Sequence, residues 1–261
     1  MHGTPPPTRP IIVCGMPRTG TSLLGQFVKK SGDLVLFPEL SPEEVPALFD
    51  LLHQTRTALE AATWRGFADD AVDARVLELL RRVWAAGRPL DEAEDPDLPR
   101  FGLKQPNAEL AHERFREALR GYPPLYLYTV RDPVAVYGSL LRMAVGGDVA
   151  PREFLRRLEA SLDAAAAIAR AEPEALSVVD VDRVSGDRAS RLSAGRRLFD
   201  RLGLPWTRKA ENFLVAWPAV NRGEGNRGDL TDGEIERRVA DLAASRRLTR
   251  LRERMTALVA G

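Results

Sequence analysis

The stretch from Gly15 to Ser22 holds the residues of this chain best suited to binding an anion: Gly-Met-Pro-Arg-Thr-Gly-Thr-Ser. It follows the apolar run 11–14 and precedes residues 23–28, whose composition predicts a helix. In a strand–loop–helix unit of this kind, backbone N–H groups and the helix N-terminus surround a negatively charged group. The stretch therefore predicts an anion site built largely from backbone.

The spacing of this loop matches the nucleotide-binding pattern GxxxxGK[ST] at every position except the lysine. Thr21 stands where that lysine would be, and the loop carries its cation further forward, at Arg18. An ordinary strand-to-helix turn is the alternative interpretation, because a glycine and a Ser or Thr cap are common there. The rest of the chain favours the anion site.

Length and composition indicate one large domain over residues 1–261 that is soluble and globular, with 44% hydrophobic and 29% charged residues. With 38 basic and 37 acidic side chains the net charge is +1, so we expect no nucleic-acid partner. No apolar stretch is long enough to span a membrane, and residues 1–10 lack the apolar core of a signal peptide. The single cysteine, Cys14, excludes an internal disulfide and is expected to be a small buried residue. We therefore expect a cytoplasmic protein.

Apolar runs alternate with segments of helical periodicity, which predicts an α/β fold with a central, mostly parallel sheet flanked by helices. The expected strands are 11–14, 34–37, 101–104, 125–130 and 176–181. Residues 42–100 form a mainly helical insertion that is a possible lid over a substrate. Residues 203–231 are expected to be irregular, and one final helix is expected to begin at Thr231.

Four of the expected strands lead into residues that handle anions or protons: Arg18, Glu39, Lys104 and Arg131. Ligands of an open parallel sheet bind beyond the carboxyl ends of the strands, so these side chains should meet at one edge. Ser139 lies two helical turns after Asp132 and faces the same way as the start of its helix. Arg131 and Ser139 are therefore expected to grip one phosphate, although helix packing alone would also explain a serine there.

The loop from Gly15 to Leu24 resembles the 5′-phosphosulfate-binding loop of sulfotransferases, which have Pro-Arg/Lys-Ser/Thr-Gly-Thr/Ser-Thr/Ser where P-loop kinases have Gly-Lys-Ser/Thr. Residues 128–139 resemble the 3′-phosphate site of that family, an arginine and a serine eight residues apart. Residues 180–182 and 202–206 are similar to the latter half of the fold. The resemblance implies a P-loop-like fold and 3′-phosphoadenosine 5′-phosphosulfate (PAPS) as the sulfuryl donor, and it leaves the insertion at 42–100 uncovered.

Departures from the cytosolic small-molecule enzymes favour a tyrosylprotein-type or related bacterial sulfotransferase. Pro106 stands where the cytosolic enzymes place a histidine base, two residues after the lysine. Tyrosylprotein-type enzymes instead place a glutamate 21 residues beyond the loop arginine, and the same count from Arg18 gives Glu39. Their Lys-x-Pro segment matches the one that begins at Lys104. The resemblance thus implies Glu39 as the base, with Lys104 and Arg18 as catalytic cations. A surface carboxylate in a turn is the alternative interpretation of Glu39, and Glu43 and Glu44 are the nearby substitutes for it.

The resemblance also implies a set of donor-binding residues and no metal. The segment 220–229 is similar to the one that closes over the 3′-phosphate, with Arg222 the first choice and Arg227 the second. The expected donor-binding residues are Arg18, Thr19, Gly20, Thr21, Ser22, Arg131, Ser139 and Arg222. Fixed cations would do the work that Mg²⁺ does in kinases.

Two other functions fit parts of the pattern. A P-loop kinase or NTPase would use Asp132 as its metal-binding acid, but the missing loop lysine disfavours it. A non-catalytic nucleotide-binding module would need only the anion site formed by the loop from Gly15 to Ser22. The expected acceptor is a hydroxyl of a small molecule, glycan or peptide, and the sequence does not specify it or the oligomeric state. The aromatic residues that could line an apolar acceptor pocket, although such residues are more often core, are Trp64, Phe67, Trp84 and Trp217.

Overall fold

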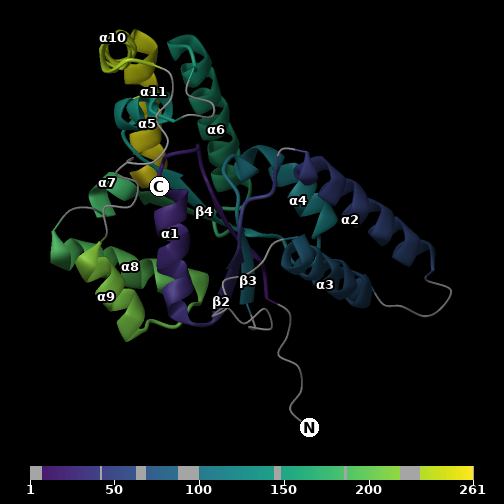
Figure 1. Ribbon diagram of the computed structural model, residues 1–261. Helices are drawn as coiled ribbons and strands as arrows, with labels where there is room; N and C mark the ends of the chain where they lie inside the picture. Colours follow the sequence, from purple (N-terminus) through teal and green to yellow (C-terminus); the bar gives the residue numbers. More distant parts are fainter. Residues whose placement is uncertain are drawn as a thin grey trace.

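A five-stranded parallel sheet lies at the centre of the protein (Figure 1). The structure is a computed structural model that describes residues 8–41, 43–62, 69–87, 100–143, 148–184, 187–217 and 230–260. The strands are β1 (Ile11–Cys14), β2 (Leu34–Phe37), β3 (Arg100–Lys104), β4 (Leu125–Val130) and β5 (Leu176–Asp180). They are ordered β2-β3-β1-β4-β5, and every neighbouring pair is parallel, which confirms the expected α/β fold. Because β1 is central, the ends of β3 and β4 flank the loop that follows it.

Helices cover both faces of the sheet, because the buried strands alternate their side chains between two apolar cores. Ile11 and Val13 belong to the core with α1, α8 and α9, whereas Ile12 and Cys14 belong to the core with α2, α3 and α4 (Figure 1). The helices and 3₁₀ turns are α1 (Thr21–Val28), η1 (Lys29–Ser31), α2 (Glu44–Ala61), α3 (Asp69–Gly87), η3 (Ala108–Ala111), α4 (His112–Ala118), α5 (Pro133–Leu141), α6 (Pro151–Ala171), α7 (Val181–Val184), α8 (Arg188–Leu202), α9 (Arg208–Ala216), α10 (Asp232–Ala243) and α11 (Arg246–Ala260).

Two expectations for the C-terminal part were wrong. A helix, α9, lies within the segment expected to be irregular; the Thr207 side chain caps it, and Ala210 and Leu214 are buried. The expected single final helix is two, α10 and α11, which are separated by two residues and pack on α5 and α6. The start of α10 was predicted correctly, because Thr231 and Glu234 form a capping box.

The described part of the insertion is a helical hairpin, α2 and α3, that packs on the sheet beside α4 (Figure 1). Trp84 of α3 is 1% exposed, and its ring lies against those of Phe37 on the edge strand β2 and Phe101 on its neighbour β3. Trp84 is therefore a core residue. Trp64 and Phe67 lie outside the described residues.

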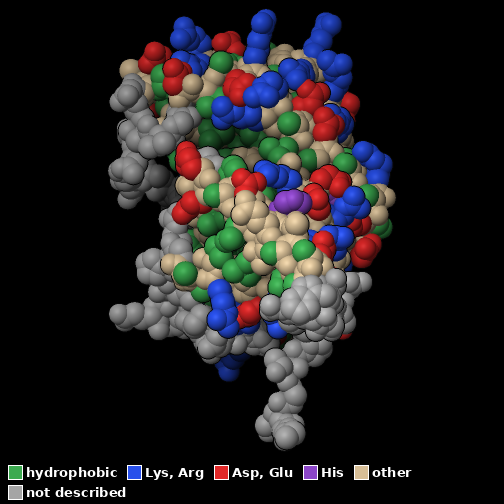
Figure 2. Space-filling model, turned by 90° about the vertical axis from the view of Figure 1, so that its right-hand side faces the viewer, with side chains coloured by type: hydrophobic (Ala, Val, Ile, Leu, Met, Phe, Trp, Pro, Cys, Tyr) green, Lys and Arg blue, Asp and Glu red, His purple; other side chains and the backbone are tan. Residues whose placement is uncertain are grey.

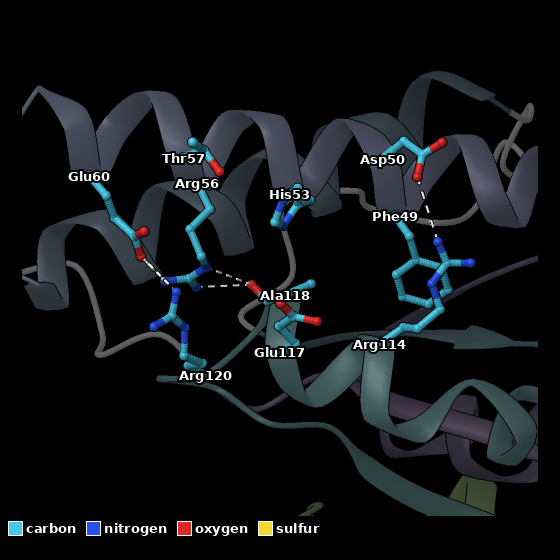
Figure 3. Close-up of a pocket in the computed structure, with 10 residues that line it drawn as sticks. All are labelled: Phe49, Asp50, His53, Arg56, Thr57, Glu60, Arg114, Glu117, Ala118 and Arg120. Atoms are coloured by element: carbon cyan, nitrogen blue, oxygen red, sulfur yellow. Dashed lines mark hydrogen bonds and ion pairs between the residues drawn. The ribbon is translucent and has the colours of Figure 1, made fainter.

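Arg56 ties the hairpin to the body of the protein. Its guanidinium is buried and donates to the carbonyl oxygen of Ala118 (2.9 Å), the last residue of α4, and to Asp73 of α3 (2.5 Å). Figure 3 shows Arg56 among the residues that line a surface cavity of about 230 Å³ between α2 and α4. Four charged side chains along the rim form two ion pairs, Arg120 with Glu60 and Arg114 with Asp50. We therefore assign this cavity to the packing of the hairpin.

Replacing Arg56 with Met should lower the free energy of unfolding by about 3–5 kcal/mol, because one partner of a buried charge pair is removed and Asp73 is left unpaired. Urea unfolding followed by circular dichroism measures the change. Arg82→Met is the matched control on α3, since its side chain is 77% exposed and forms an exposed ion pair with Glu78. The control should change stability by about 1 kcal/mol or less. Equal effects of the two variants would contradict this role of Arg56.

The surface carries charges of both signs. On the face shown in Figure 2, basic and acidic side chains are interspersed. Within the described ranges, no helix is both long and apolar enough to cross a bilayer.

Candidate functional site

The loop between β1 and α1 has the backbone geometry of an anion cradle. Gly15 and Gly20 have φ values of 119° and 107°, which side-chain-bearing residues rarely adopt. A Cβ at Gly15 would lie 2.5 Å from the carbonyl oxygen of Thr129, so only glycine fits against β4. Gly20 is the N-cap of α1, and no side chain caps the amides of the first turn. Those amides and the helix dipole favour a bound anion.

Thr19 fixes the shape of this loop from inside. It is 5% exposed, and its hydroxyl donates a hydrogen bond to the carbonyl oxygen of Met16 (2.6 Å). Its backbone N–H donates to the same oxygen (3.2 Å). The Thr129 hydroxyl lies 2.6 Å from that of Thr19 and donates to the carbonyl oxygen of Cys14. The Thr19 side chain thus supports the cradle rather than facing outward, and Thr129 is a partner that the sequence analysis missed.

Lys104 and Glu39 meet beside the cradle. The ammonium group of Lys104, at the end of β3, lies 2.7 Å from Glu39 Oε1 and 3.4 Å from Ser22 Oγ in the first turn of α1. Glu39 is two residues beyond the end of β2, and its side chain is 46% exposed. The parallel sheet therefore brings together the carboxylate, the lysine and the loop hydroxyl, in a position open to solvent.

Glu44 and the two described histidines lie away from Lys104. The Glu44 carboxylate accepts a hydrogen bond from the Ser41 N–H at the start of α2. His53 lines the surface cavity of Figure 3, and His112 packs edge-on against Tyr126. The pKa of His112 is lowered, chiefly by burial. Neither histidine lies with Lys104, so Glu39 is the carboxylate best placed to act as a base.

The two residues expected to share a phosphate make different contacts. Ser139 of α5 accepts a hydrogen bond from Arg18 Nε (2.9 Å), and Arg131 Nε donates to Asp182 (3.2 Å). Although both residues are described, no hydrogen bond joins Arg131 to Ser139. Asp182 also accepts from the N–H of Asp132 (2.7 Å), so it fixes the turn after β4. Asp182 is a second residue of the site that the sequence analysis did not identify.

Asp132 serves as a helix cap. Its side chain accepts a hydrogen bond from the Ala135 N–H at the start of α5, as expected for a residue that precedes Pro133. Its other oxygen is paired with Arg252 of α11 (2.5 Å). A carboxylate held in this way is poorly suited to the metal-binding role that a kinase or NTPase would require.

A buried carboxyl group, Glu109, lies directly behind the loop. It is 1% exposed and accepts hydrogen bonds from the Gly15 N–H (3.1 Å) and the Ser161 hydroxyl (2.5 Å). Ser161 in turn contacts the Tyr128 hydroxyl (2.8 Å). Burial raises the pKa of Glu109 and, with Glu109 as its neighbour, that of the Cys14 thiol. Cys14 is buried, as expected, and Glu109 holds the first peptide group of the cradle in place.

Two further expectations concern a metal and Arg222. Within the part of the chain that the structure describes, no three His, Cys, Asp or Glu side chains are grouped closely enough to hold a metal ion. Arg222 and Arg227 lie outside the described residues.

Comparison with known proteins connects this geometry to a family. A family model described as "Sulfotransferase family" matches residues 10–208, and no curated protein sequence is similar enough to count as a relative. Among solved structures, the chain is similar to sulfotransferase STF1 from Mycobacterium tuberculosis (16% identity, TM-score 0.49, covering 96% of this chain and 77% of that one). It is also similar to mouse sulfotransferase SULT7A1 complexed with PAP (10% identity, TM-score 0.48, covering 92% and 74%).

Proposed function

The chain belongs to the sulfotransferase family, and on that premise we propose that it transfers a sulfuryl group from PAPS to an acceptor hydroxyl, with Glu39 as the general base. The observation that carries this proposal is the Lys104 ammonium group, which lies between the Glu39 carboxylate and Ser22 of the cradle. A base and a cation beside an anion site are the parts that in-line transfer of a charged group needs.

The cradle and the adjoining strand ends fit a donor with phosphate groups at two positions. The uncapped first turn of α1, with Gly20, Thr21 and Ser22, suits the 5′-phosphosulfate. The 3′-phosphate would be held by Arg131 and Ser139 together with Arg222, as the family resemblance implies. Thr19 contributes through the shape of the loop.

In the proposed reaction the acceptor hydroxyl loses its proton to the Glu39 carboxylate. The acceptor oxygen forms a bond to sulfur as the bond between sulfur and the 5′-phosphate oxygen breaks. Lys104 and Arg18 stabilise the charge on the sulfuryl oxygens and on the departing phosphate oxygen, which fixed cations can do without a metal. The products are the sulfated acceptor and adenosine 3′,5′-bisphosphate.

The proposal extends to the acceptor class and the compartment. A half-exposed Glu39 is accessible to a hydroxyl of a small molecule, a glycan or a peptide. The single cysteine is buried at the end of β1, which suits a reducing, cytoplasmic environment.

The test is transfer of ³⁵S from labelled PAPS to a panel of alcohols, phenols, sugars and tyrosine peptides, with and without EDTA. We expect a labelled product and the same rate in EDTA, because the proposed charge stabilisation comes from Arg18 and Lys104. Loss of activity in EDTA would contradict the proposed mechanism. Tight binding of adenosine 3′,5′-bisphosphate without transfer to any acceptor would favour a non-catalytic module, and ATP hydrolysis would favour an NTPase.

A further inference from the structure

The pairing of β2 with β3 stops just before Glu39. The last paired residues of the ladder are Phe37 and Leu103. Pro38 follows and has no N–H to donate, so the backbone ladder cannot continue in its regular form. Glu39 therefore lies beyond the hydrogen bonds that hold β2 in the sheet.

The side chain of Gln105 takes over where the ladder ends. Its Oε1 accepts a hydrogen bond from the Leu40 N–H (2.8 Å), and its Nε2 donates to the Leu40 carbonyl oxygen (3.4 Å). A carboxamide has an acceptor and a donor like those of a peptide group, so the Gln105 side chain supplies the hydrogen bonds that the backbone of the next residue in β3 would otherwise make. Gln105 is itself fixed, because its N–H donates to the carbonyl oxygen of Val13 on β1 (2.9 Å).

We infer that Gln105 is a positioning residue for Glu39: its carboxamide holds Leu40, and with it the Glu39 backbone, so that the carboxylate faces Lys104. This inference rests on the proposed role of Glu39 as the base. Consecutive residues of one segment thus hold Glu39 in two ways, Lys104 through its side chain and Gln105 through the neighbouring backbone.

The ion pair alone would hold Glu39 weakly. Its side chain is 46% exposed, and pairs of exposed charges contribute little because water screens them and long side chains lose freedom. The hydrogen bond from the Leu40 N–H to Gln105 restrains the backbone next to Glu39. This restraint remains when the Glu39 side chain moves. Misplacement of a reacting group by about 1 Å can cost about 10²-fold in rate, so this restraint bears on turnover.

The two hydrogen bonds between the Gln105 side chain and Leu40 are tested by amide hydrogen exchange at Leu40, measured by NMR on the full chain. Gln105→Met keeps the length of the side chain and removes both hydrogen bonds, so exchange should become about tenfold faster. Gln105→Glu keeps the acceptor for the Leu40 N–H and should retain protection. Gln54→Met, the same change at an exposed site on α2, should have no effect at Leu40. Unchanged exchange in Gln105→Met would overturn the inference.

The link to Glu39 is tested by turnover of labelled PAPS with water as the acceptor and by the Kd of adenosine 3′,5′-bisphosphate. In Gln105→Met we expect kcat to fall about tenfold or more while the Kd stays within about twofold, because the cradle is untouched. Faster exchange with unchanged kcat would make Gln105 merely structural and overturn the inference. A wild-type protein that protects Leu40 but never transfers sulfate would instead refute the proposed function, and with it the catalytic part of the inference.

Discussion

Replacing Glu39 with Gln should lower kcat for sulfuryl transfer about 10²–10⁴-fold and leave the Kd of adenosine 3′,5′-bisphosphate unchanged. The amide has the shape of the carboxylate and can still accept a hydrogen bond from Lys104, but it cannot take up the acceptor's proton. The loss should therefore appear in single-turnover rates with saturating PAPS, while titration calorimetry with the bisphosphate shows normal binding.

Glu43→Gln is the matched control, because it removes the same charge four residues away at an exposed site before α2. This variant should turn over at the wild-type rate. Both variants should unfold at similar temperatures, since Glu39 is half-exposed and its ion pair adds little to stability. Near-wild-type turnover in Glu39→Gln would remove Glu39 from the role of base.

Most of the fold could be predicted from local sequence patterns. Four of the five strands are short, mainly apolar runs, β3 (Arg-Phe-Gly-Leu-Lys) being the exception, and the helices between the strands imply parallel pairing. Once the sheet is parallel, its strand ends must share one edge, which is why Glu39 and Lys104 could be expected to meet. The helix α9 was not predicted, although Thr207 is a suitable N-cap and Ala210 and Leu214 have helical spacing. The whole segment 203–231 was interpreted as irregular because it is rich in glycine near its end.

The support behind the site could not be predicted in the same way. Glu109 occupies a helical segment, where a glutamate is ordinarily a surface residue, and its burial depends on Ser161, 52 residues further along. The pairing of Arg18 with Ser139 joins residues 121 positions apart. Such contacts depend on how α5 and α6 pack on the sheet, which periodicity does not specify. Sequence patterns therefore indicate which residues reach the edge, and the packing determines which of them contact each other.

Replacing Lys104 with Met should lower kcat about 10²–10³-fold, the loss typical when one group that stabilises transition-state charge is removed. The methionine keeps the apolar stem, which packs near Gly25 of α1, so the change is confined to the charge. Lys209→Met, on the exposed side of α9, is the control and should leave turnover unchanged. Normal turnover in Lys104→Met would contradict its role as a catalytic cation.

The double variant Glu39→Gln/Lys104→Met distinguishes a joint role from two independent ones. The two side chains lie 2.7 Å apart beside the same cradle, so each single change also disturbs the group that remains. Residues that act as a unit show strongly non-additive losses, and we expect the double variant to be only slightly slower than the slower single variant. Single-turnover rates of the wild type and the three variants measure this coupling. A loss equal to the product of the two single losses would show that the base and the cation act separately.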